Sequence, residues 1–164
     1  MNPPGRSILF VAIVALLALM GGIVYYASLD NEDLSMATIE LQSVELTDVN
    51  SLENRATLKV TFLVTNPGDV TVTVPVITYQ LYADGSKIGQ GTYSTEDVAM
   101  PGRAAFYPDA EIPLKSKLTI VMSEMNETVY GKIISGQTIQ YSAIGMLTVE
   151  SAWSIVELDF DTNN

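Results

Sequence analysis

The residues of this chain best suited to chemistry are three carboxylates near its C-terminal end. Glu157, Asp159 and Asp161 recur at every second position. On a β-strand this spacing places the three side chains on one face, where carboxylates could gather a hard cation such as Ca²⁺. The segment lacks the turn and the carbonyl ligands of a dedicated calcium loop, so a solvated outer face is the favoured interpretation. We therefore predict no metal site.

Two residue types that usually carry out catalysis are missing. The chain contains no cysteine and no histidine, which removes disulfides, thiolate nucleophiles, histidine bases and the usual zinc ligands. Serine and threonine are common, but no histidine can activate their hydroxyls and no Ser-x-x-Lys motif occurs. We predict a protein that is not an enzyme, with no catalytic residue and no cofactor. Its net charge of -11 also disfavours nucleic acid as a partner.

A charge-free run of twenty-two residues, Ser7 to Ser28, lies near the N-terminus. As a helix it would be about 33 Å long, enough to cross a hydrocarbon core of about 30 Å. A cleavable signal peptide is the alternative, but its apolar stretch is usually about 7 to 15 residues and ends in a small-x-small site. Tyr25-Tyr26-Ala27 places an aromatic residue where that site needs a small one. We predict a retained single-pass membrane anchor with Tyr25 and Tyr26 at the outer headgroup level.

The charges that flank this run predict its orientation. Arg6 precedes it, whereas Asp30, Glu32 and Asp33 follow it as an acidic collar. Because basic residues tend to stay on the cytoplasmic side, the N-terminus is expected inside and the C-terminal domain in an extracellular or periplasmic location. We divide the chain into a tail and transmembrane helix (residues 1–29), an acidic linker (30–37) and a β-sandwich domain (38–164).

Alternation of apolar and polar residues predicts strands along most of this domain. Thr57 to Thr65 is the clearest case, with alternate apolar residues including Phe62 on one face. In Thr38 to Leu46 the apolar phase slips between Leu41 and Val44, which predicts a β-bulge. Asn66-Pro67-Gly68-Asp69 is typical of a type II turn, and alternating valines from Val70 to Val74 follow it.

The middle of the chain carries a strong hairpin signal. Asp84-Gly85 is a preferred two-residue type I′ loop and places Leu81 opposite Ile88. A further turn is expected at residues 100–103. A strand through Phe106 to Leu114 would be an edge strand or broken, because Pro108 and Pro113 interrupt it.

From Leu114 the apolar spacing becomes helical. Residues at steps of three and four predict one amphipathic helix that ends near Ser135-Gly136: Leu118, Val121, Met125, Val129 and Ile133. Met122 and Met125 would then fill the core rather than form a partner groove. Strands Thr138–Val149 and Ala152–Phe160 close the domain, with Trp153 buried between the sheets.

Seven or eight short antiparallel strands with one late helix predict an all-β fold, a sandwich of two sheets. The order of features in VTFLVTNPGDVTVTVPVITYQLYADGSKIGQGTYS (residues 60–94) is a strand, an Asn-Pro, a valine-rich strand, a Tyr-x-Leu strand, and Asp-Gly before Ile-x-x-Gly. It resembles the late embryogenesis abundant type 2 proteins, also called the water stress and hypersensitive response (WHy) domain. The likeness covers about Ile39 to Phe160, more loosely after Met100-Pro101-Gly102.

This resemblance implies an immunoglobulin-like or fibronectin-like sandwich with a helix near one end. It also implies a non-catalytic role linked to dehydration and stress, displayed beside a membrane in members with one N-terminal span. Because the family pattern is structural, no functional residue is carried over.

We therefore expect a membrane-anchored exterior module, acting as an accessory or stress-protective protein on other membrane or cell-surface proteins or on the membrane surface. One alternative is an archaellin-like or pilin-like filament subunit, although such precursors are cut after a glycine preceded by a basic residue, and here Pro4 precedes Gly5. A second is a carrier of small apolar ligands between the sheets. The partner, the oligomeric state and glycosylation of the sequon at Asn126 stay open.

Overall fold

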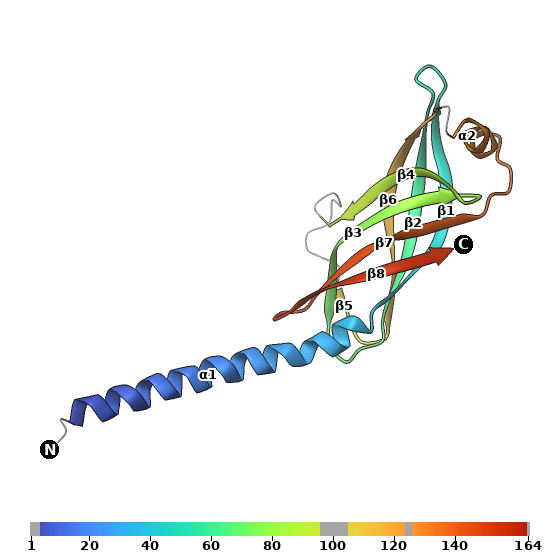
Figure 1. The fold of residues 1–164 in the computed structure, drawn as a ribbon. Helices are drawn as coiled ribbons and strands as arrows, with labels where there is room; N and C mark the ends of the chain where they lie inside the picture. Colours follow the sequence, from blue (N-terminus) through green and yellow to red (C-terminus); the bar gives the residue numbers. More distant parts are fainter. Residues whose placement is uncertain (1–3, 96–104, 124–125, 164) are drawn as a thin grey trace.

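A long helix followed by a two-layer β-sandwich forms the molecule (Figure 1). The computed structural model describes residues 4–95, 105–123 and 126–163. The turn predicted at residues 100–103 and the methionine at position 125 lie outside these ranges. In chain order the elements are α1 (Pro4–Ser35), β1 (Thr38–Asn50), β2 (Arg55–Asn66), β3 (Val72–Ala83), β4 (Ser86–Ser94), β5 (Ala105–Phe106), β6 (Ala110–Val121), α2 (Glu127–Ile134), β7 (Tyr141–Glu150) and β8 (Ile155–Asn163).

Two antiparallel sheets make up the sandwich. One has the order β1-β2-β6, and the other has the order β4-β3-β7-β8 with β5 paired to β3. The predicted all-β sandwich is thereby confirmed. Both prolines near β6 occupy positions that tolerate a missing N–H: Pro108 lies in the turn before β6, and Pro113 lies within β6 itself, an edge strand of its sheet.

The core lies between the sheets and is built on alternation along β2. Leu58, Val60, Phe62 and Val64 are all fully buried, as their spacing predicts. The Phe62 ring meets the edges of two rings from the other sheet, Tyr79 at 4.9 Å and Phe160 at 5.8 Å between centroids. These contacts fix how the two layers face each other.

The bulge predicted in β1 is confirmed. The register of β1 on β2 shifts between Leu41 and Ser43, so Leu41 pairs with Phe62 and Ser43 pairs with Thr61. The extra residue restores the inward phase after the slip in the apolar pattern.

The hairpin between β3 and β4 has the predicted turn and a different register. Asp84 and Gly85 both have positive φ, 48° and 78°, as a type I′ turn requires. Leu81 nevertheless pairs with Gly89, and not with Ile88 as predicted, because the register shifts between Leu81 and Tyr82. Ile88 is the extra residue of a bulge and remains buried.

The predicted type II turn after β2 is wrong. A type II turn needs positive φ at its third residue, and Gly68 is not among the positive-φ residues. The Asn66 side chain shapes this loop instead, since its Oδ1 accepts a hydrogen bond from the Gly68 N–H at 3.2 Å. Glycine suits this position, because a Cβ at position 68 would lie 3.0 Å from the Asp33 carbonyl oxygen, which is a tight contact.

The helix predicted from Leu114 is also wrong over its first part. Residues 114 to 121 belong to β6, whose buried positions are Leu114, Ser116, Leu118 and Ile120. Among the described residues of the predicted helix, the helical ones form α2 (Glu127–Ile134). The period of two is hidden in the sequence because one inward position is a serine. The predicted end is confirmed, since Ser135 caps α2 and Gly136 follows with φ 68°. Met122, expected as core filler on the helix, lies beyond β6 and is partly exposed.

The helix α1 extends through most of the segment expected to be an acidic linker. It remains helical to Ser35, and the turn after it leads directly into β1. Leu34 is fully buried and belongs to the sandwich core. The helix therefore joins the sandwich through a packed contact rather than through a free tether.

Candidate functional site

The three carboxylates of β8 lie on one face of an edge strand. Glu157, Asp159 and Asp161 pair with Thr148, Met146 and Ile144 of β7, and all three are exposed. Over the described ranges, no three acidic side chains gather closely enough to hold a metal ion. The arrangement is that of a solvated outer face.

A polar bridge crosses the core between the sheets. The Tyr79 hydroxyl donates to Ser116 Oγ at 3.0 Å, and Ser116 Oγ donates to the Thr92 carbonyl oxygen at 3.0 Å. Burial raises the pKa of Tyr79, and the hydrogen bond to Ser116 acts in the opposite direction. Because the serine proton is already committed to a carbonyl and no base faces it in this bridge, the pair is suited to alignment of the sheets rather than to nucleophilic attack.

A broad depression of about 740 Å³ crosses strands of both sheets. Its lining includes Gln80, Gln90, Lys117 and Asp159. The lining also includes apolar side chains such as Leu118 and Met146, and the depression is open to solvent. It is therefore not the enclosed apolar cavity that a carrier of small apolar ligands would need.

Two ion pairs tie separate elements together. Lys59 Nζ lies 2.5 Å from Glu45 Oε2, and this hydrogen bond lowers the pKa of Glu45. Lys132 of α2 lies 2.7 Å from Asp84 Oδ2 in the β3–β4 turn. The Lys132 hydrogen bond, with a second from the Gln140 N–H, lowers the pKa of Asp84. The first pair joins β1 to β2, and the second attaches α2 to the β3–β4 turn at the end of the sandwich.

The single glycosylation sequon lies at the start of α2. Asn126 is the N-cap residue and is buried, with an exposed fraction of 8 %. Its Oδ1 accepts from the Ser123 N–H at 2.7 Å, and its Nδ2 donates to the Val121 carbonyl oxygen at 3.0 Å. The amide that would carry a sugar is thus already engaged in the fold.

The most distinctive surface is the junction where α1 meets the sandwich. Residues from Ser7 to Ser35 form one helix apolar and long enough to cross a membrane, and the domain buries none of its most apolar stretch. The C-terminal end of the helix, in contrast, packs onto the sandwich through Leu34. A side-chain contact between Asn31 of α1 and Ser154 adds a polar link to the β7–β8 turn.

The β7–β8 turn presents the only tryptophan of the chain. Ser151 Oγ accepts from the Trp153 N–H at 3.2 Å and from the Ser154 N–H at 3.1 Å, while the Ser151 N–H donates to the Ser154 carbonyl oxygen at 2.8 Å. Trp153 was expected between the sheets, and this is wrong: 69 % of its surface is exposed. Trp153 lies in the turn before β8, outside the alternation that points strand residues into the core, so its side chain projects from the surface of the domain.

The exposed indole stands beside the membrane-length helix. Trp153 and one face of α1 line an apolar depression of about 430 Å³, formed with Ala18, Leu19, Gly22, Ile23 and Tyr26. Figure 1 shows the β7–β8 connection reaching past the end of the sandwich toward α1. Alternation of strand residues could not reveal this contact, because it joins a turn to a helix more than a hundred positions away.

Comparison with known proteins shows the fold. No protein-family model matches the chain, and no curated protein sequence matches it. A solution structure from Arabidopsis thaliana is similar with a TM-score of 0.51 and 16% identity, over 77% of this chain and 79% of that one. The X-ray structure of a structural-genomics target is similar with a TM-score of 0.50 and 9% identity, over 80% and 86%.

A third solved structure, titled as a late embryogenesis abundant protein, has a TM-score of 0.44 and 11% identity, over 96% of this chain and 88% of that one. At such identities the likeness concerns architecture alone. The two structures with TM-scores of 0.51 and 0.50 thus support the β-sandwich fold of this chain and nothing beyond the fold.

Proposed function

We propose that this protein is a membrane-anchored, non-catalytic β-sandwich module. In this proposal α1 spans the membrane with the N-terminus in the cytoplasm, and the sandwich stands on the exterior side. There the sandwich acts as an accessory or stress-protective module through contacts with other membrane or cell-surface proteins or with the membrane surface.

The observation that carries the proposal is the continuity of α1. The helix is apolar and unburied along its charge-free run, and it passes without a break into an end that packs on the core through Leu34. It also continues through Tyr25-Tyr26-Ala27, the position of the only signal-peptide-like site. An apolar helix that the domain does not cover requires another apolar environment, and a bilayer provides it.

The non-catalytic part rests on how the reactive groups are used. The buried hydroxyls of Tyr79 and Ser116 are paired with each other and with a backbone carbonyl. The carboxylates of β8 are exposed to solvent on an outer face. The β-sandwich fold shared with the similar solved structures is compatible with this interpretation.

Two measurements on the full chain in its native membrane test the proposal. First, α1 should keep the protein in the pellet after alkaline carbonate extraction, since a spanning helix resists removal. Second, with an epitope tag at each end, protease added to right-side-out vesicles should destroy the C-terminal tag and leave the N-terminal tag protected. Release by carbonate would exclude the anchor, and the reverse protection pattern would exclude the orientation.

A filament subunit is the second candidate, because a long exposed helix joined to an acidic sandwich is also the arrangement of an archaellin or pilin. The intact mass of the native protein separates the two. A mature chain that starts at Arg6 favours the filament, whereas a chain that retains its first residues favours the anchor.

A further inference from the structure

The exposed tryptophan has an ordered position that the sandwich fold itself does not require. Three backbone and side-chain hydrogen bonds around Ser151 define the β7–β8 turn, and the Asn31–Ser154 contact holds the turn against α1. Exposing a large indole on an ordered turn leaves apolar surface in water without an internal benefit. Ile155, which follows the turn, is also exposed, with 64 % of its surface free.

The position of the indole along α1 indicates how deeply it would lie in the bilayer that α1 is proposed to span. The helix residues that share its depression extend from Ala18 to Tyr26, all within the charge-free run. Gly22, at the middle of this stretch, lies six residues before Ser28, or about 9 Å at the rise of an α-helix. If α1 spans the bilayer, Trp153 therefore lies beside a stretch that runs from the headgroup border at Tyr26 into the outer hydrocarbon of the leaflet from which α1 emerges.

The composition of the turn favours lipid as its neighbour. Residues 151–155, Ser-Ala-Trp-Ser-Ile, carry no charge, and tryptophan is the side chain that most favours the membrane interface because its ring is apolar and its N–H is polar. No basic residue in the turn would attract anionic headgroups, so insertion should depend on the interface itself.

We propose that the β7–β8 turn is an interfacial foot of the domain. Trp153 and Ile155 enter the outer interface of the same bilayer that α1 crosses, while the hydroxyls of Ser151 and Ser154 stay at the headgroup level. The domain then has two attachments to the membrane, the helix and the foot, and its tilt is fixed. This inference rests on the proposed anchor, and it adds a second, independent lipid contact.

The experiment uses the full chain reconstituted in phosphatidylcholine vesicles. Since Trp153 is the only tryptophan, its fluorescence reports on the foot alone. We expect blue-shifted emission, protection from aqueous acrylamide, and strong quenching by lipids brominated on the acyl chain close to the headgroup. Lipids brominated near the chain ends should quench less.

A matched control moves the tryptophan to the other end of the domain. In the double variant Trp153→Phe, Leu52→Trp, the indole replaces a side chain that is 98 % exposed in the β1–β2 turn. That turn lies at the end of the sandwich remote from α1 (Figure 1). We expect this reporter to be quenched by acrylamide and unaffected by brominated lipid.

Flotation of the same vesicles separates the two proposals. Protein that floats with the vesicles, with Trp153 quenched by acrylamide and not by brominated lipid, overturns the foot and leaves the anchor standing. Protection from both quenchers means that protein, such as a second copy, covers the indole, and this also overturns the foot. Failure to float at all overturns the anchor and the foot together.

Discussion

At the scale of single residues, polar side chains inside this domain connect segments that the strands leave apart. Asn66 is fully buried, and its Nδ2 donates to the carbonyl oxygens of Val70 at 2.8 Å and Phe106 at 3.0 Å. One side chain thus joins the β2–β3 loop to β5. The Tyr79–Ser116 bridge does the same between the sheets.

Asn66→Ala should destabilise the domain by about 1 to 3 kcal/mol, because one buried and one partly buried carbonyl lose their donor. The matched control is Asn50→Ala, which removes a side chain that shapes the exposed β1–β2 turn by accepting from the Leu52 and Glu53 N–H groups. Water can replace those bonds, so the free energy of unfolding, measured with urea, should fall less for Asn50→Ala than for Asn66→Ala. Equal losses for the two variants would contradict this role of burial.

Lys132 should control the acidity of Asp84. Its hydrogen bond is the largest cause of the lowered pKa of that carboxyl, so Lys132→Met should raise the Asp84 pKa in an NMR titration, whereas Lys87→Met on the same hairpin should not. A carboxyl with a lowered folded-state pKa stabilises the fold above its unfolded-state pKa. That stabilisation is lost as pH falls through the folded-state pKa. An unchanged Asp84 titration in Lys132→Met would exclude the pair.

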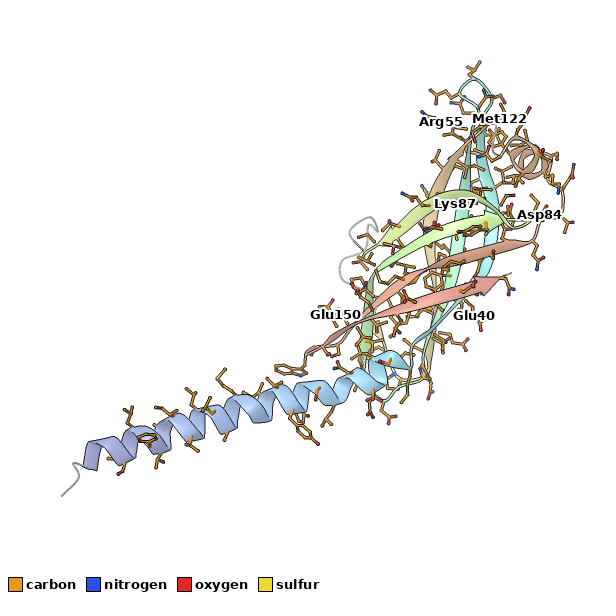
Figure 2. The ribbon with its side chains drawn as sticks, viewed as in Figure 1. Glu40, Arg55, Asp84, Lys87, Met122 and Glu150 are labelled. Atoms are coloured by element: carbon orange, nitrogen blue, oxygen red, sulfur yellow. The ribbon has the colours of Figure 1, made fainter. Side chains whose placement is uncertain are left out.

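At the scale of elements, β7 has a neighbouring strand on each edge, and its inner face lies on the core. It lies between β3 and β8, and Gly145 pairs with Tyr79 on one side and Phe160 on the other. Figure 2 draws the side chains of the sandwich as sticks on its ribbon. The side chains of Tyr79 and Phe160 both contact Phe62. Position 145 therefore has no room for a side chain.

Gly145→Ala should destabilise the sandwich by about 1 to 3 kcal/mol or more, as overpacking does. A Cβ there would lie 2.1 Å from the Thr78 carbonyl oxygen and 2.8 Å from the Tyr79 Cα, so backbone must move. Gly131→Ala in α2 is the control, since nothing lies within 4 Å and alanine favours helix by about 0.5 to 1 kcal/mol. The melting temperature should fall for Gly145→Ala and rise for Gly131→Ala. An unchanged melting temperature for Gly145→Ala would mean that β3 and β7 are farther apart than the structure shows.

At the scale of the whole molecule, an acidic domain stands on an apolar helix. The whole chain has a net charge of -11, which favours solubility and repels anionic surfaces. Under the proposed function, this charge leaves membrane contact to uncharged segments such as the β7–β8 turn. We interpret the carboxylates on the outer face of β8 as part of this overall negative charge and not as a metal-binding site.

Neutralising Glu157, Asp159 and Asp161 together, to Gln, Asn and Asn, should leave the fold intact and change mainly solubility and salt response. Calcium should not raise the melting temperature of the wild-type protein. A rise that grows with calcium concentration and disappears in the triple variant would instead place a cation site on β8.

Local patterns in the sequence determined those features that depend on neighbours along the chain. The charge-free run predicts a helix of membrane length, the alternation around Phe62 predicts a core strand, and Asp84-Gly85 predicts its turn, because each signal comes from residues a few positions apart. The bulge in β1 was predictable for the same reason.

Only the tertiary structure decided which positions face inward where a polar residue interrupts the apolar alternation, or where a residue lies in a turn and outside that alternation. Ser116 can be buried because Tyr79 and Thr92 from the other sheet form hydrogen bonds with its hydroxyl. This inward serine interrupts the apolar alternation of β6, so the segment was predicted as a helix. Asn66 shapes its loop through a strand forty residues away. Trp153 lies outside because the turn that carries it is fixed against α1. Each of these outcomes depends on partners distant in sequence, and local periodicity carries no information about them.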